Sequence, residues 1–286
     1  MLGVSRSGYY DWRRRQRPAP ADAGPHSGSP SGPRAQTRAA RWAQLLEQIT
    51  AISREHGAYG SPRIHQELLR RGVRVGRHQV ARLMRRHGIS ARRGKIKARP
   101  RAAPPARRPE ITDLVQRDFH ADVANAVWFT DITQIRTGEG WLFAAVILDA
   151  FNREVVSYAV DGYQTPKTAY QAFSDAVRAR RPPPGCIIHS DRGYQFTSQD
   201  WLDLAHHSKL RVSIGEEKNA LDNAAIESWF SSYKSEELYP HGQPPTRAEA
   251  RSRLFAYIWD YNHHRLHSTL GYVPPVTYAA NSSICP

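Results

Sequence analysis

One stretch of this chain, residues 141–148, is almost continuously apolar, and it constrains the fold more than any other. A strand with apolar side chains in both directions has to be covered on both faces, as strands in α/β proteins are. Residues 127–135 and 154–160 also read as strands, and Gly138-Glu139-Gly140 is typical of a hairpin turn. We therefore expect a three-stranded meander inside a sheet that has helices on both faces.

Beyond the meander, helix-like and strand-like segments alternate. Helical patterns span 165–180, 198–209, 221–238 and 246–262, and short strands are expected at 186–189 and 211–214. Such alternation implies parallel pairing with helices on both sides of the sheet. The predicted class is α/β, a mixed sheet in the order of a ribonuclease-H-like domain, although periodicity alone leaves other mixed sheets open.

The front of the chain has a different texture, with three short helical patterns separated by glycines. The residues expected to face inward are Leu45, Ile49 and Ile52 in the first helix, Ile64, Leu68 and Leu69 in the second, and Val80, Leu83 and Met84 in the third. Ser61 is expected to cap the second helix, with Pro62 at its first position. Two short helices joined by a tight turn indicate a small all-α helix-turn-helix domain.

The outer positions of the third helix are basic. They include Arg77, His78, Arg82 and Arg85. An apolar stripe alone is usually ordinary core, but a helix that enters a DNA groove has to meet phosphates with cations. These four residues are therefore predicted to bind DNA.

Charge divides the chain in the same way. Residues 1–108 hold 25 Lys and Arg against 5 Asp and Glu, whereas residues 109–286 hold 16 against 21. A basic half beside a slightly acidic half suggests a polyanion-binding module joined to a part that concentrates carboxylates. The less specific alternative is a basic surface that serves only solubility.

Composition also sets the expected domain boundaries. A basic segment at 1–17 precedes a Pro-, Ala-, Gly- and Ser-rich flexible linker at 18–38. The helix-turn-helix domain is expected at 39–95, a basic linker at 96–118, and the α/β domain at 119–284. Two cysteines are too few for a disulfide framework or a cysteine-based zinc site, and no apolar run is long enough to span a membrane. The expected location is cytoplasmic.

Three carboxylates stand at positions that the predicted α/β fold could bring together. Asp131 lies within an apolar strand, Asp191 directly follows another, and Glu227 lies in a helical stretch. Taken singly, Asp191 reads as a turn residue and Glu227 as a helix-surface acid. Together they match the hard oxygen ligands with which proteins hold paired Mg²⁺ ions for phosphodiester chemistry. They are the predicted catalytic and metal-binding residues.

The motifs around these acids carry a family resemblance. Trp128-Phe129-Thr130-Asp131-Ile132-Thr133, His189-Ser190-Asp191-Arg192-Gly193 and Asp222-Asn223-Ala224-Ala225-Ile226-Glu227-Ser228 resemble the DDE signatures of bacterial insertion-sequence transposases, with 35 residues between Asp191 and Glu227. The chain most resembles the second-reading-frame product of the insertion-sequence-three family, whose catalytic core is similar to retroviral integrase. Residues 2–10, 59–64 and 261–272 resemble other motifs of that family.

The resemblance implies a DNA transposase. It would cleave the ends of an insertion element with two Mg²⁺ ions, which Mn²⁺ could replace, and join the freed 3′-hydroxyl to target DNA. It also implies that Asn223, Lys234 and Arg265 contact DNA, although Arg265 could instead cap a helix end. Implied partners are double-stranded DNA, further copies of the chain and a first-reading-frame protein or fusion, and the location becomes the bacterial nucleoid. The alternatives are a non-catalytic DNA-binding product of a decayed element and a stand-alone nuclease of the same fold.

Overall fold

The computed structural model describes residues 33–94, 111–215 and 223–282 of the chain. The chain divides into two compact units, residues 1–47 and 48–286. The described part of the first unit is the beginning of helix α2, Pro33–Glu55. The predicted basic segment at 1–17 and the greater part of the two predicted linkers lie outside the described residues. The helix begins before residue 39, so the end of the predicted flexible linker is helical, as its alanines and arginines favour.

Helices α2, α3 (Ser61–Arg70) and α4 (Arg77–Arg86) form the predicted helical region. Its buried side chains are Leu45, Ile49, Ile52, Ile64, Leu68, Val80, Leu83 and Met84. Two details differ from the expectation. Gly60, not Ser61, is the N-cap of α3, and Leu69 is 41% exposed. Leu68 lies one turn after Ile64 on the same face, whereas Leu69 is turned about 100° further around the helix axis.

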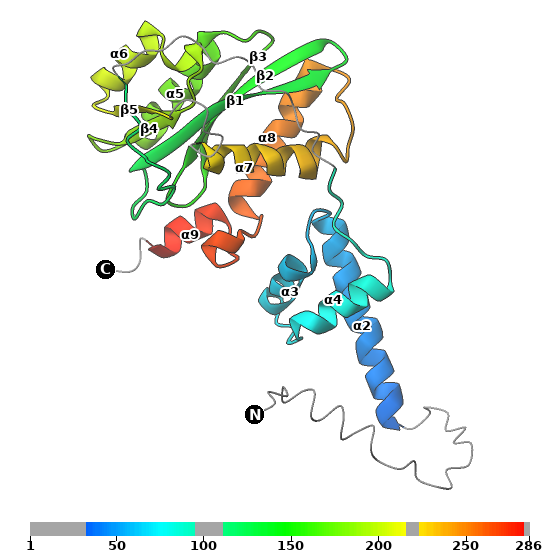
Figure 1. The fold of residues 1–286 in the computed structure, drawn as a ribbon. Coiled ribbons are helices and arrows are strands. Elements are labelled where there is room, and N and C mark those ends of the chain that lie inside the picture. Colours follow the sequence, from blue (N-terminus) through cyan, green and yellow to red (C-terminus); the bar gives the residue numbers. More distant parts are fainter. Residues whose placement is uncertain (1–32, 95–110, 216–222, 283–286) are drawn as a thin grey trace, which may run out of the picture. The chain divides into compact units, whose positions relative to one another are not determined.

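The second unit contains a five-stranded sheet (Figure 1). Its strands are β1 (Val127–Thr137), β2 (Gly140–Asp149), β3 (Val155–Asp161), β4 (Ile187–Ser190) and β5 (Arg211–Ile214), in the order β3-β2-β1-β4-β5. β1 pairs with β2 and β2 with β3 in antiparallel fashion, whereas β1–β4 and β4–β5 are parallel. This arrangement confirms the predicted meander followed by parallel strands.

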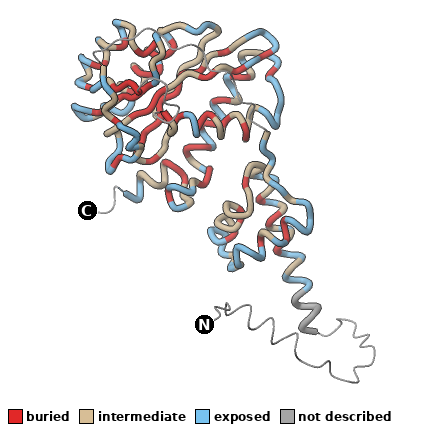
Figure 2. The backbone as a smooth tube through the Cα atoms, in the orientation of Figure 1, coloured by how far each residue is buried: buried red, intermediate tan, exposed pale blue. Residues whose placement is uncertain are grey.

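Alternate strand residues point to opposite sides of the sheet, and both sides carry apolar side chains. Helices therefore cover both faces. Trp128, Ala145 and Ile147 share one core with α5 (Pro166–Arg180) and α6 (Gln199–His207). Phe129, Val146 and Leu148 share the other with α7 (Ala224–Tyr233) and α8 (Arg247–His263). Figure 2 shows the resulting buried interior in red along the strands and the inner sides of these helices. The predicted α/β class is therefore confirmed.

Short elements complete the second unit. Two 3₁₀ turns, η1 (Tyr194–Phe196) and η3 (Ser268–Leu270), and helix α9 (Pro275–Ser282) were not predicted. A π-helical segment, η2 (Lys234–Leu238), continues directly from α7. None of the helices in the described ranges is long and apolar enough to cross a lipid bilayer.

Candidate active site

The pairing of β1 with β4 places Asp131 and Asp191 at the same level of the sheet. The last paired residues of the two strands are Thr130 and Ser190, and a carboxylate follows each of them. Neighbouring strands lie about 4.8 Å apart, so these two residues leave the last pair side by side. Asp131 continues in β1, where it pairs with Val146 of β2, and Asp191 begins the loop after β4. Asp191 thus lies at the carboxyl end of a parallel strand, where ligand sites of α/β sheets form.

Helix α7 brings Glu227 to the same place. The amide of Asn223, the N-cap of α7, donates a hydrogen bond of 3.2 Å to the backbone carbonyl of Thr130, the residue before Asp131. One helical turn later, the backbone N–H of Glu227 donates to the carbonyl of Asn223 over 3.1 Å. The first turn of α7 is therefore fixed beside β1, and the side chain of Glu227 is exposed there.

The electrostatics of Asp131 report the convergence of the three acids. Burial by the surrounding protein, followed by the charge of Asp191 and then that of Glu227, raises the pKa of Asp131 well above its ordinary value. A 2.7 Å hydrogen bond from the backbone N–H of Ile132 to Asp131 Oδ1 acts in the opposite direction. The three carboxylates therefore lie close enough to repel one another, which is the repulsion that a bound cation relieves.

The pKa of Asp191 is also raised, although Asp191 is exposed at the protein surface. Desolvation by the protein around it raises the pKa of Asp191, and the Gly193 N–H, 2.9 Å from Asp191 Oδ1, and the nearby His189 lower it. The hydrogen bond to Gly193 fixes the orientation of the carboxylate within the turn after β4.

The donor set fits a hard divalent cation. Every candidate ligand is a carboxylate oxygen, the donor that Mg²⁺ prefers, and no histidine or cysteine is among the three. Across the described ranges, no three or more His, Cys, Asp or Glu side chains already stand in a metal-coordinating group. In this part of the chain the three acids are therefore electrostatic neighbours.

Lys234 lies near the acids, at the first position of η2. Its Nζ lies 5.8 Å from the centre of the Phe230 ring, and its charge lowers the pKa of Asp131. A cation one to two turns beyond Glu227 therefore faces the carboxylate cluster.

A buried histidine beneath Asp191 was not singled out from the sequence as functional. His189 Nδ1 shares a 2.8 Å hydrogen bond with Ser213 Oγ and lies 3.7 Å from Asp113 Oδ1. Because Ser213 belongs to β5, this contact ties the end of β4 to its neighbour. The alternation of β4 would have placed His189 inside, but only the pairing with β5 reveals its partner.

The predicted DNA-binding residues separate into two groups. Arg77, His78, Arg82 and Arg85 are all exposed on α4, on the side away from its buried residues. Asn223 and Arg265 are buried, at 7% and 4% exposure, and both form hydrogen bonds within the protein. Asn223 holds β1, and Arg265 forms two 2.8 Å bonds to Glu236. Their DNA contacts stay predictions, and in this structure both side chains support the fold.

Comparisons with known proteins agree with this geometry. Residues 121–220 and 208–275 each match an integrase core domain family, and residues 40–97 match a family described as an HTH-like domain. A 31 kDa protein of insertion element IS600 from Shigella sonnei is 34% identical over 97% of this chain and 96% of its own length. The transposase InsF for insertion sequence IS3A from Escherichia coli K12 is 33% identical over 96% of this chain and 90% of its own.

The fold has a solved counterpart. A chain of the simian T-cell lymphotropic virus intasome, determined in complex with the PP2A regulatory subunit B56 gamma, superposes with a TM-score of 0.51. The two chains are 17% identical, and the match covers 84% of this chain and 76% of that one. At this identity the likeness concerns the fold alone, and it agrees with the ribonuclease-H-like order of the strands.

Proposed function

As a member of the IS3 family of insertion-sequence transposases, which its relatives show it to be, this chain is a DDE-type enzyme of DNA transposition, and we propose that Asp131, Asp191 and Glu227 are its catalytic and metal-binding residues. The observation that carries the proposal is geometric: Asp131 and Asp191 directly follow the paired residues Thr130 and Ser190, and the Asn223 amide ties the start of α7, which carries Glu227, to the Thr130 carbonyl. Residues far apart in the sequence have been brought to one place despite their repulsion. Such an arrangement costs stability and is typical of a site that binds cations.

The proposed reaction has two steps. Water first hydrolyses the phosphodiester bond at an element end and leaves a 3′-hydroxyl. That hydroxyl then attacks a target phosphodiester and forms the new strand junction, with the displaced target 3′-oxygen as the leaving group. Two Mg²⁺ ions, or Mn²⁺ in their place, would be held by Asp131, Asp191 and Glu227 and would supply Lewis acidity that stabilises negative charge on the attacking and leaving oxygens.

The protein's own residues would orient this chemistry. Asp131 is held by the Ile132 N–H and Asp191 by the Gly193 N–H, so both carboxylates have a fixed direction. Glu227 is carried on α7, and Lys234 is placed to bind a DNA phosphate beside the acids. The exposed cations of α4, Arg77, His78, Arg82 and Arg85, would bind the DNA backbone.

The assembly that acts on DNA is also part of the proposal. We expect several copies of the chain to bind double-stranded DNA together at the element ends, with a first-reading-frame protein or fusion as a further partner. The place of action would be the nucleoid DNA of a bacterial cytoplasm.

The test uses labelled duplex DNA that carries the terminal sequence of the encoding element. The unmodified chain should cleave this DNA and join it to a target plasmid when Mg²⁺ is present. Asp131→Asn, Asp191→Asn and Glu227→Gln should each lower both activities at least a hundredfold, and each should bind the duplex within a few-fold of the unmodified chain. Asp175→Asn is the matched control, because Asp175 is an acid on α5 that pairs with Arg178 at the surface.

Three other outcomes would contradict the proposed function or the proposed site. Binding without cleavage by the unmodified chain would favour a non-catalytic DNA-binding product. Cleavage without joining would favour a nuclease. Normal strand transfer by Asp191→Asn would exclude the assigned site.

A further inference from the structure

Two stretches that the candidate active site does not use meet in the structure. One is the motif at 59–64, at the start of α3, and the other is the motif at 261–272, after α8. The Tyr59 hydroxyl accepts a 2.9 Å hydrogen bond from the Leu266 N–H and lies 3.4 Å from the His264 carbonyl. Tyr59 is 3% exposed. The two motifs therefore share a buried contact within the second unit.

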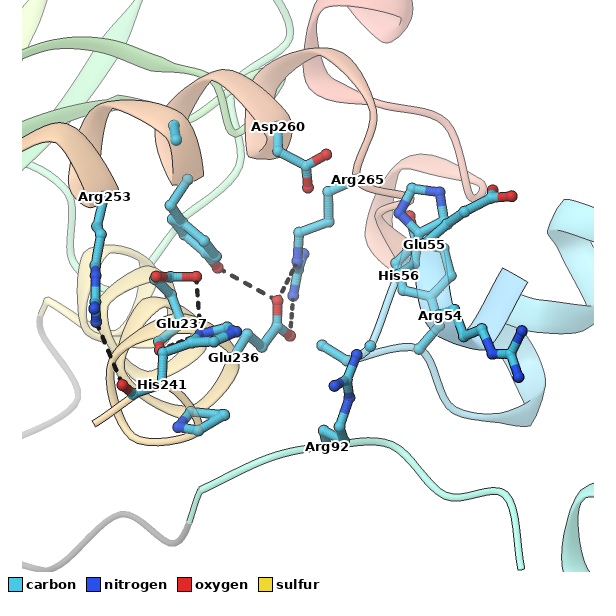
Figure 3. Close-up of a pocket in the computed structure, with 16 residues that line it drawn as sticks. Arg54, Glu55, His56, Arg92, Glu236, Glu237, His241, Arg253, Asp260 and Arg265 are labelled. Carbon is cyan, nitrogen blue, oxygen red and sulfur yellow. Dashed lines mark hydrogen bonds and ion pairs between the residues drawn. The ribbon is translucent and has the colours of Figure 1, made fainter. Parts of the chain in front are cut away.

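A carboxylate, Glu236, lies at the centre of this contact. Arg265 approaches it with Nε 2.8 Å from Oε2 and Nη2 2.8 Å from Oε1, which is a bidentate pair. The Tyr257 hydroxyl donates to Oε2 over 3.4 Å. Figure 3 shows Arg265 and Glu236 facing each other, with the dashed bonds between them. Both side chains are almost fully buried, at 5% and 6% exposure.

Two further arginines reach Glu236 from the helix-turn-helix region. Arg63 of α3 approaches Oε1 at 3.4 Å, and Arg93, beyond α4, approaches the same oxygen at 3.3 Å. The Gly94 N–H also donates a 2.9 Å hydrogen bond to the carbonyl of Ser235, the residue before Glu236. We refer to Glu236, Arg63, Arg93 and Arg265 as the Glu236 cluster.

The strengths of these contacts differ. Arg265 makes two short, buried bonds, whereas Arg63 and Arg93 share one oxygen at longer distances, and Arg93 is 48% exposed. Three guanidinium groups around one carboxylate also leave an excess of positive charge. The two contacts from the helix-turn-helix region should therefore be removable while the Arg265–Glu236 pair remains in place. A cavity of about 450 Å³ lined by Tyr59, Arg92, Glu236 and Arg265 leaves room beside the cluster (Figure 3).

The position of Glu236 along the chain gives the cluster its significance. Lys234 is the C-cap of α7 and the first residue of η2, and Glu236 lies two residues later in the same η2 segment. Helix α7 in turn carries Glu227. Glu236 is therefore connected to Lys234 and to the end of α7 by continuous helix, so a change in the position of Glu236 should also shift these two.

We propose that the Glu236 cluster connects the DNA-binding helices to the catalytic helix, with Glu236 as the residue that positions α7 and Lys234. DNA bound by the helix-turn-helix region holds Arg63 and Arg93, and these hold Glu236. The active-site acids then adopt their working positions on bound element ends. This inference rests on the proposed function, because it assigns a regulation to the same active site.

The test compares the full chain with the double variant Arg63→Gln/Arg93→Gln. Three quantities are measured: the melting temperature, the affinity for the labelled end duplex, and the single-turnover cleavage rate at saturating duplex with Mg²⁺. Coupling between distant sites typically changes the coupled quantity 5- to 150-fold, so the cleavage rate of the saturated complex should fall on the order of tenfold. The melting temperature should stay within a few degrees of that of the unmodified chain, because Arg265 still pairs with Glu236.

Two controls make the result specific. Arg71→Gln removes an arginine of the same region that pairs with Glu55 and Glu67 and not with Glu236, and its cleavage rate should be unchanged. Arg63→Lys/Arg93→Lys keeps both cations and should recover most of the lost rate. A double glutamine variant that cleaves saturating end DNA at the unmodified rate would overturn the proposal. So would an equal loss in Arg71→Gln, or no recovery with lysine.

Failure of this inference can be told apart from failure of the proposed function. If the unmodified chain cleaves end DNA and the double variant cleaves it equally well, only the coupling is wrong. If the unmodified chain cleaves no end DNA under any tested condition, the proposed function is wrong, and the coupling with it.

Discussion

Removing Glu236 should destabilise the protein more than removing its partner Arg265. Glu236→Gln leaves the guanidinium of Arg265, which is 4% exposed, without a carboxylate and close to the cations of Arg63 and Arg93. Breaking a buried ion pair from one side costs about 3–5 kcal/mol. For a protein of this size, each kcal/mol lowers the melting temperature by about 2–4 °C, so a fall of roughly 6–20 °C is expected.

Arg265→Gln should cost less, about 1.5–3 kcal/mol, because it removes hydrogen bonds to a charged group and leaves Glu236 with two other arginines. The two surface ion pairs of Arg71, with Glu55 and with Glu67, serve as the comparison. Arg71→Gln should lower the free energy of unfolding by about 0–1 kcal/mol. Urea unfolding at pH 7 measures all three free energies. The reasoning is refuted if Glu236→Gln is as mild as Arg71→Gln, or if Arg265→Gln is the more damaging of the pair.

The same pair has a defined pH dependence. Burial alone would raise the pKa of Glu236, but the hydrogen bonds and charge of Arg265, with Arg63 and Arg93, lower it below its ordinary value of 4.5. The stabilisation is therefore complete above pH 4.5 and is lost as the pH falls through the lower pKa of the folded state. The difference in stability between the unmodified chain and Glu236→Gln should narrow only below pH 4.5.

Three further predictions concern single residues. Because the three proposed active-site carboxylates repel one another, Asp131→Asn should melt at a higher temperature than the unmodified chain in EDTA. Added Mg²⁺ should raise the melting temperature of the unmodified chain by more than it raises that of Asp131→Asn. Burial, with the charge of Arg265, lowers the pKa of His267 to about 3, so protonation favours the unfolded state between pH 6.5 and 3; His267→Gln should flatten the loss of melting temperature across that range. Burial raises the pKa of the Cys186 thiol to about 12, so iodoacetamide should alkylate Cys186 in urea far faster than in the native protein, as mass spectrometry of peptides would show.

Local patterns predicted the elements of the fold closely. The strand expected at 127–135 is Val127–Thr137, and the helix expected at 165–180 is Pro166–Arg180. Both follow from the spacing of apolar residues within a few turns or pleats, which a single segment contains in full. The parallel order of the later strands followed as well, because alternating helices and strands leave few other connections.

Contacts between segments that are distant in the sequence could not be predicted from local patterns. That Asp131 and Asp191 follow the paired residues Thr130 and Ser190 depends on the register of β1 against β4, and neither strand specifies its partner's offset. The sequence suggested that the acids meet, through their motifs, without giving the geometry.

The surroundings of buried polar residues could not be predicted from the sequence. The sequence indicated neither the burial of Arg265 and Asn223, two residue types that are usually exposed, nor the importance of Glu236. Only the partners supplied by the fold, Glu236 for Arg265 and the Thr130 carbonyl for Asn223, show that burial is compensated.

The two kinds of support under the acids have a mechanical consequence. The backbone ladder between β1 and β4 ends at Thr130 and Ser190, the residues directly before Asp131 and Asp191. Glu227 is carried on α7, a separate element that the Asn223 amide ties to the Thr130 carbonyl at the end of that ladder. All three acids are therefore held through one short stretch of β1, and disrupting the backbone at Thr130 would displace all three together.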